Sequence, residues 1–185
     1  MQHQNILELS KSALLIIDMQ EAFRASIKKF KKYARRIAVA AQGAQLLKLP
    51  ILVTEQYPKG LGHTASEITA VLPQDTEIVE KTSFSSCGAA NFIAKLQQRQ
   101  INQVIITGIE AHICVNQTVH DLLASNYQVH LLTDCITSRS KIDRNIAFKK
   151  MQASGAILSS VEMALFELMR DAKHEQFKAI QGLIK

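Results

Sequence analysis

The sequence has little of what would place it outside the ordinary globular class. Its 185 residues include no tryptophan, three cysteines, three prolines and seven glycines. So few glycines and prolines exclude collagen-like and low-complexity chains. With 47% hydrophobic and 21% charged residues, a disordered chain is excluded as well. We therefore expect residues 1–185 to fold as one domain around a hydrophobic core.

The low number of cysteines and the short apolar runs indicate the compartment in which we expect the protein. Three cysteines cannot all pair within one chain, and no basic leader followed by an apolar run opens the sequence. Both observations favour a reducing, cytoplasmic setting. No apolar stretch approaches the roughly 20 residues that span a bilayer, so we expect no membrane partner.

The net charge of +6 comes from one short segment. Outside it, 15 basic residues face 16 acidic ones. Apolar residues at helical spacing predict that this segment opens a helix whose opposite face carries the charges in water. Nucleic acid is the alternative partner, but the sequence holds no base-reading motif, so we do not expect it. The basic residues are Arg24, Lys28, Lys29, Lys31, Lys32, Arg35 and Arg36, and the apolar stripe is Tyr33, Ile37, Ala41, Ala44 and Leu47.

Apolar runs of strand length alternate with segments of helical periodicity. Several runs are nearly continuous in Val, Ile and Leu, as in parallel strands that are covered on both faces. The order of these elements predicts a doubly wound α/β fold with a mostly parallel sheet. The predicted strands are Ala13–Asp18, Ile51–Thr54, Glu77–Glu80, Gln103–Thr107, Val129–Thr133 and Ala156–Ser159.

Three chemically active side chains stand where predicted strands end. Asp18 closes the first strand, Lys81 follows the third, and Cys114 follows the fourth at the start of a helix. Ligands of such folds bind beyond the carboxyl ends of the strands, so an acid, an amine and a thiol would meet at one edge. A helix N-terminus and an ammonium both favour the thiolate, so we expect the pKa of Cys114 to fall. Asp18 would then carry protons.

Each of these residues also has a structural interpretation. Cys114 could be a small buried hydrophobe, Asp18 the cap of a strand-to-helix turn, and Lys81 a surface lysine. The motifs assign no acid–lysine pair to the other thiols, Cys87 and Cys135, so we expect structural roles for them, with a redox pair as the alternative. Spacing alone leaves these alternatives open.

Three segments resemble the signature segments of the isochorismatase-like cysteine hydrolases. They are Leu15–Gln20 (LIIDMQ), Glu80–Ser85 (EKTSFS) and Gly108–Val115 (GIEAHICV). A fourth segment, Thr54–Gly62 (TEQYPKGLG), is similar to the subgroup of isochorismatase domain-containing proteins. The resemblance covers most of the chain, in the correct order, and several independent motifs coincide in it.

The resemblance implies a catalytic triad of Asp18, Lys81 and Cys114 on a three-layer sandwich with a six-stranded sheet. It places a cis peptide bond between Ile109 and Glu110, and an oxyanion hole at the amides of Glu110 and Cys114. The implied reaction cleaves a small-molecule amide-type C–N bond through a thioester, without a cofactor. Lys81 would activate the thiolate and Asp18 would act as general acid and base. The resemblance also implies a homo-oligomer.

The sequence departs from two branches of that family. Nicotinamidases carry an Asp-x-His metal motif after the second strand, whereas Thr54–Tyr57 reads TEQY and His63 stands alone, so we predict no metal. Isochorismatases generally have a small residue at the position of Cys114. The presence of Cys114 therefore favours small amides or ureides as substrates over isochorismate.

Substrate contacts are expected from four residues near the motif segments, although their aromatic members suit a core equally well. The alternative to an enzyme is a catalytically inactive binding or scaffold protein that recruits an acidic partner with the basic segment. The intact triad argues against that alternative. The four expected substrate contacts are Gln20, Phe23, Tyr57 and Phe84.

Overall fold

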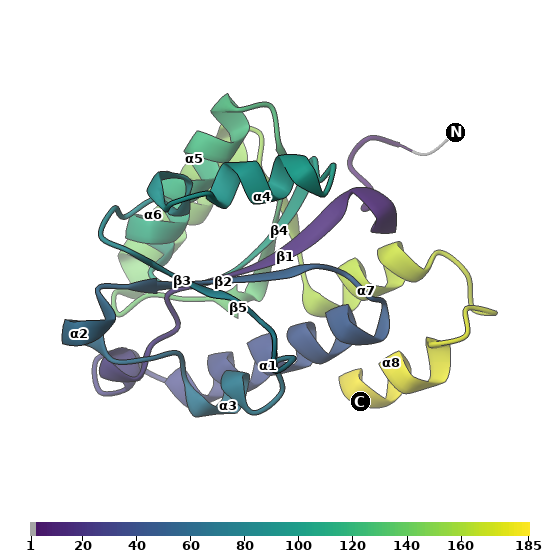
Figure 1. Cartoon of the computed structure of the whole chain (residues 1–185), viewed down its shortest axis with the longest axis horizontal. Coiled ribbons are helices and arrows are strands. Elements are labelled where there is room, and N and C mark those ends of the chain that lie inside the picture. The colour runs from purple at the N-terminus through teal and green to yellow at the C-terminus, as the bar shows by residue number, and fades with distance from the viewer. Residues whose placement is uncertain (1–2) are drawn as a thin grey trace.

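A six-stranded sheet lies between two layers of helices in the computed structural model, which describes residues 3–185 (Figure 1). Neighbouring strands pair in parallel throughout, in the order β3-β2-β1-β4-β5-β6. The predicted doubly wound fold is confirmed. The strands are β1 Ser12–Ile17, β2 Ile51–Gln56, β3 Ile78–Lys81, β4 Gln103–Gly108, β5 Gln128–Ile136 and β6 Ile157–Ser159.

The predicted strand boundaries differ from the observed ones by a few residues. Strand β3 includes Lys81 as its last residue, and β1 ends at Ile17, just before Asp18. The largest difference is in β5, which was expected to end at Thr133. It continues to Ile136 because the pairing with β4 resumes at Gly108 after an irregularity.

The helices cover both faces of the sheet (Figure 1). Helices α1, α7 and α8 pack on the face that carries Leu14 and Ile16, and α4, α5 and α6 pack on the face that carries Leu15 and Ile17. Alternate residues of one strand therefore enter two separate cores. No helix within residues 3–185 is long and apolar enough to cross a membrane. The helices are α1 Phe30–Leu46, α2 Pro58–Leu61, α3 Ser66–Thr69, α4 Phe92–Gln98, α5 Asn116–Ala124, α6 Lys141–Ala153, α7 Val161–Met169 and α8 Phe177–Ile184.

The basic segment before and within α1 is only partly free. Arg24 forms ion pairs with Glu21 at 2.7 Å and Glu67 at 2.8 Å, and Arg36 forms one with Asp134 at 2.7 Å. These two arginines are half-buried because Glu21, Glu67 and Asp134 pair with them, whereas the prediction that most of the charges face water is confirmed. The remaining members are exposed, and we call them the lysine cluster: Lys28, Lys29, Lys31, Lys32 and Arg35.

Candidate active site

Asp18 follows strand β1 and is held on both carboxylate oxygens. Its Oδ1 accepts a hydrogen bond from Thr54 Oγ1 at 2.7 Å, and its Oδ2 lies 2.6 Å from Lys81 Nζ. The Asp18 backbone N–H donates to the Thr54 carbonyl at 3.1 Å. Only 2% of Asp18 is exposed. Burial leaves this carboxylate to interact with a few fixed neighbours instead of bulk water.

Gly108 allows strand β4 to lie close to the end of β1. Its φ is 111°, a conformation that side chains other than glycine rarely adopt. A Cβ at this position would lie 2.0 Å from the carbonyl oxygen of Ile17. Glycine is therefore required where the chain passes from β4 to the loop that carries Glu110.

Lys81 is the last residue of β3, and its side chain is fully buried. Besides Asp18, its Nζ donates to Gln56 Oε1 at 2.9 Å and to the carbonyls of Ser83 at 3.1 Å and Phe84 at 3.0 Å. Four oxygens thus surround one ammonium. This arrangement compensates the loss of water around a buried charge.

Cys114 lies in a π-helical turn, Ala111–Val115, which leads directly into α5. Thr118 Oγ1 donates to the Cys114 carbonyl at 2.7 Å and accepts from the Ser86 N–H at 2.9 Å. The turn is thereby tied to the loop that follows β3. Cys114 is 7% exposed, so the sulfur is almost enclosed.

The expected fall in the pKa of Cys114 is wrong. The pKa of this thiol is raised to about 12, chiefly by burial and then by the Asp18 carboxylate, and the Lys81 ammonium opposes this rise only in part. The ammonium is paired with Asp18 at 2.6 Å, so little of its charge is left to stabilise a thiolate. The fold nevertheless places the acid, the amine and the thiol in one cluster, since Asp18 pairs with Lys81 and both act on Cys114.

The peptide bond between Ile109 and Glu110 is cis, in agreement with the family resemblance. The Glu110 carboxylate accepts hydrogen bonds from the Arg139 backbone N–H at 3.0 Å and from its Nη1 at 2.8 Å. The Ala111 N–H donates to the Thr137 carbonyl at 2.9 Å. These bonds fasten the loop before Cys114 to the connection between β5 and α6. Within residues 3–185, the Glu110 N–H donates no hydrogen bond to another backbone group.

Two of the four expected substrate contacts, Gln20 and Phe23, pack within the protein beside the cluster. Gln20 is fully buried, and its amide bonds the backbone N–H and carbonyl of Gln56 and the Gly62 carbonyl. It therefore clamps the loop after β2 and has no surface left for a substrate. Phe23 is half-buried and packs against the core that contains Met19 and Ile109, so its contact with a substrate stays a prediction.

The other two expected contacts are exposed near the cluster. Tyr57 is 55% and Phe84 52% exposed. Tyr57 lines a depression of about 370 Å³, together with Lys81 and Gly88. The Phe84 carbonyl accepts a hydrogen bond from Lys81 Nζ, which places this residue next to the ammonium. Their rings are thus available to a ligand, unlike Gln20.

Sequence reasoning missed Thr54 and Gln56, which hold the two charged groups from strand β2. The parallel register pairs Thr54 with Ile17, the residue before Asp18. A search for polar residues at the end of the neighbouring strand would have found both. His63, which has no second histidine near it in the sequence, lies with its Nδ1 3.0 Å from Oε2 of the buried Glu55.

Comparisons with known proteins identify the family of this chain. Residues 12–163 match the model of the isochorismatase domain. Isochorismatase domain-containing protein 2A of Mus musculus is 43% identical over 175 residues, covering 94% of this chain and 82% of the relative. The structure of the MAR1 ribonuclease of Caenorhabditis elegans is 40% identical with a TM-score of 0.91, covering 97% of this chain and 92% of that one.

A more distant structure shares the fold alone. The nicotinamidase SaPncA of Staphylococcus aureus is 19% identical with a TM-score of 0.72, and the similarity covers 82% of this chain and 99% of that one. The family model spans most of this chain, from the start of β1 into α7. The chain therefore belongs to the isochorismatase family.

Proposed function

We propose that this protein is a cysteine hydrolase that cleaves an amide-type C–N bond of a small molecule. The observation that carries the proposal is the buried Asp18–Lys81 pair beside the Cys114 thiol. An acid, a cation and a nucleophile within one buried cluster are the groups that acyl transfer requires. No step of this chemistry calls for a metal or an organic cofactor.

In the first step the Cys114 sulfur attacks the carbonyl carbon of the substrate. Because the pKa of the thiol is about 12, it carries its proton at neutral pH, and Asp18 accepts that proton as the C–S bond forms. The carbonyl π electrons move to oxygen. The Glu110 and Cys114 amides would bind the resulting oxyanion, and removing one such donor typically costs about 10²–10³ in rate.

The second step releases the amine. Asp18 returns its proton to the substrate nitrogen, the C–N bond breaks, and a thioester remains on Cys114. Water then attacks the thioester while Asp18 accepts one of its protons. The C–S bond breaks, the sulfur regains a proton from Asp18, and the carboxylic acid leaves. Lys81 and Thr54 hold the carboxylate in place throughout.

A parallel screen tests this proposal. Small amides and ureides would be incubated with the wild type, Cys114→Ala and the matched control Cys87→Ala, while mass spectrometry monitors acylation of the protein. We expect Cys114→Ala to lose all acylation and at least about 10³-fold in turnover, since it removes the nucleophile. The control should keep both. Turnover that survives in Cys114→Ala would refute covalent catalysis.

Self-association is the second part of the proposal. The family resemblance implies a homo-oligomer, and several large apolar side chains are exposed, among them Ile142 and Ile146 on α6. Sedimentation velocity would measure the mass of the particle directly. A monomer at every concentration would remove this part and leave the chemistry intact.

RNA cleavage is a second candidate function. The C. elegans relative is called a ribonuclease, and the exposed lysine cluster offers five cations to a phosphate backbone. Labelled RNA would be incubated with the wild type, Cys114→Ala and Lys28→Glu/Lys31→Glu. Cleavage lost only in the charge variant would favour this function. RNA binding without any cleavage would instead favour a binding or scaffold protein.

A further inference from the structure

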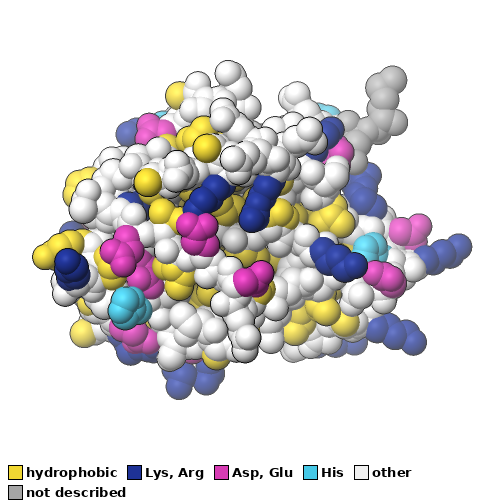
Figure 2. All heavy atoms as spheres, viewed as in Figure 1, with side chains coloured by type: hydrophobic (Ala, Val, Ile, Leu, Met, Phe, Trp, Pro, Cys, Tyr) yellow, Lys and Arg dark blue, Asp and Glu magenta, His cyan; other side chains and the backbone are white. Residues whose placement is uncertain are grey.

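A cleft of about 620 Å³ opens at the amino ends of β2 and β3, the edge of the sheet opposite to the Asp18–Lys81–Cys114 cluster. Strand β3 begins at Ile78, which pairs with Val53, so it does not reach Ile51 and Leu52. This face of the molecule shows basic and acidic side chains on either side of an apolar strip (Figure 2). The cleft is thus a gap in the sheet edge with charged walls.

The walls come from three elements. Helix α4 and the residue after it contribute Lys95 and Arg99, the segment before β3 contributes Asp75 and Glu77, and Lys48 follows α1. The floor between them is apolar, and it includes Pro50, Leu52 and Val79. A ligand in this cleft would therefore meet an apolar surface with a cationic side and an acidic side.

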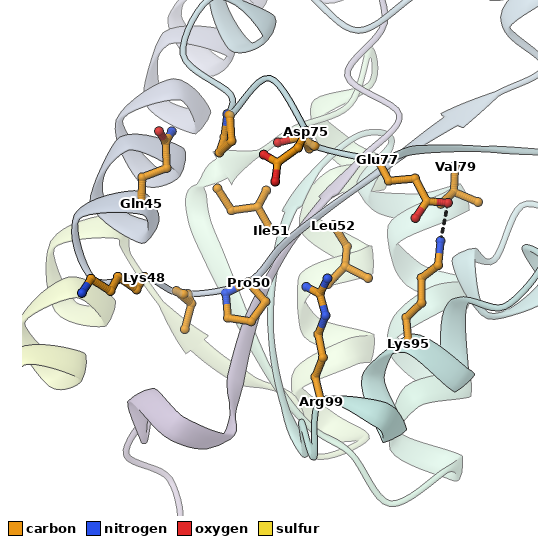
Figure 3. Close-up of a pocket in the computed structure, with 13 residues that line it drawn as sticks. Gln45, Lys48, Pro50, Ile51, Leu52, Asp75, Glu77, Val79, Lys95 and Arg99 are labelled. Atoms are coloured by element: carbon orange, nitrogen blue, oxygen red, sulfur yellow. Dashed lines mark ion pairs between the residues drawn. The ribbon is translucent and has the colours of Figure 1, made fainter.

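Only some of these charges neutralise each other. Lys95 Nζ lies 2.5 Å from Glu77 Oε1. Asp75 and Arg99 point toward each other from opposite sides of Ile51 and Leu52, but no ion pair joins them (Figure 3). Within residues 3–185, neither side chain forms an ion pair or a hydrogen bond, and the same holds for Lys48. The cleft thus presents three charged groups that no ion pair neutralises within the described residues: the Asp75 carboxylate, the Arg99 guanidinium and the Lys48 ammonium.

We propose that this cleft binds a small amphoteric molecule of the size of an amino acid or a dipeptide. Its carboxylate would bind Arg99 through two parallel hydrogen bonds, its ammonium would bind Asp75, and its apolar side chain would lie on Leu52 and Val79. A purely anionic ligand would meet Asp75 and Glu77, and a purely cationic one would meet the three basic residues. A ligand with both charges satisfies both walls, and the volume lies in the usual range for such sites.

The proposed site is separate from the catalytic cluster and independent of its chemistry. Val79 lines the cleft, and Lys81 lies two residues further along the same strand, at the other end of β3. The cleft and the cluster therefore use different side chains of a common strand. Binding can be measured without any assay of hydrolysis.

Saturation-transfer NMR tests the proposal with L-leucine, L-phenylalanine and the dipeptide Leu-Leu as probes at millimolar concentration. We expect transfer to at least one of them. Arg99→Gln and Asp75→Asn should each weaken its binding by about tenfold or more, because each removes one charged partner. The control Lys149→Gln, an exposed residue of α6, should leave binding unchanged. 4-Methylpentanoate and 3-methylbutylamine, which lack the ammonium and the carboxylate of leucine, should both bind more weakly than leucine.

Three results would overturn the proposal. The first is no transfer from any of the three probes, and the second is binding that neither cleft variant weakens. The third concerns a different occupant. If hydrogen exchange at Ile51 and Leu52 slows with protein concentration in the absence of a probe, a second copy of the chain covers the cleft.

Discussion

The charged side chains at the two ends of the sheet differ in burial and in pairing. At the carboxyl end, Asp18 and Lys81 are buried, and every polar atom of both side chains has a partner. At the amino end, Asp75 and Arg99 are exposed, and neither forms an ion pair with any residue of the described range 3–185. Water solvates the exposed charges at no cost, whereas a buried charge must be paired or lost. Rigid pairing suits a reaction centre, and free charges suit the capture of a ligand.

One buried group departs from this rule. His130 of β5 is fully enclosed, and neither of its ring nitrogens has a hydrogen-bond partner within residues 3–185. Burial lowers the pKa of His130 to about 4. Unlike Lys81, this side chain avoids the cost of burying a charge by staying neutral.

Breaking the buried pair should have the largest effect on stability. Lys81→Met leaves the Asp18 carboxylate buried without a cation, and we expect a loss of about 3–5 kcal/mol in the free energy of unfolding. The control Lys95→Met breaks the pair with Glu77, whose side chain is 68% exposed. It should cost less than about 1 kcal/mol. Urea unfolding measures both, and equal losses would contradict the contrast between the two ends.

Lowering the pH should reduce the stability of the fold through the buried His130. Its pKa is lowered from 6.5 to about 4 in the folded state. Between these two pH values, the unfolded chain binds a proton at His130 that the folded chain does not bind. Stability is therefore complete above pH 6.5 and falls as the pH drops toward 4, by up to about 3 kcal/mol. His130→Leu should remove this component, whereas His3→Gln, an exposed residue, should not. Urea unfolding at a series of pH values would show whether the two slopes differ.

The protonation of Cys114 gives a kinetic test of the carboxyl end. With a pKa of about 12 for Cys114 and about 11 for Cys87, alkylation by N-ethylmaleimide should rise with pH up to at least pH 10 at both sites. Cys87, which is less buried, should react faster. Asp18→Asn should speed the alkylation of Cys114, because the carboxylate raises the pKa of this thiol. A rate at Cys114 that levels off near pH 7 would mean a resting thiolate and would remove Asp18 as the acceptor of its proton.

The smallest effect on stability is expected for the exposed Arg139, which pairs with Glu110 beside the cluster. Arg139→Gln removes one ion pair to Glu110 but keeps the backbone N–H that also bonds this carboxylate. Arg139 is 56% exposed, so the loss should be about 1 kcal/mol or less. Thermal unfolding gives the stability, and hydrogen exchange at residues 111–115 reports on the loop. A loss of stability as large as that of Lys81→Met would show that the exposed Arg139–Glu110 pair stabilises the fold as strongly as the buried Asp18–Lys81 pair does.

Much of the fold was predictable because the strands carry nearly continuous Val, Ile and Leu. Both faces of the sheet are covered, so the signal is strong in strands such as Gln103–Gly108. Asp18, Lys81 and Cys114 were predictable for a related reason, since parallel strands bring their carboxyl ends to one edge. The backbone bonds of Gln20 were not predictable, because a motif position does not reveal whether a side chain faces a ligand or the protein's own backbone.

The sequence by itself determined the α/β architecture and the edge at which an acid, an amine and a thiol gather, because both follow from local patterns and the order of the strands. Only the tertiary structure decided that Lys81 is neutralised by Asp18, that Thr54 and Gln56 complete the pairing, and that Cys114 keeps its proton. It also decided which charges at the opposite edge stay unpaired. The reason is physical: pKa and pairing depend on burial and on distances of a few ångströms between segments that lie far apart in the chain.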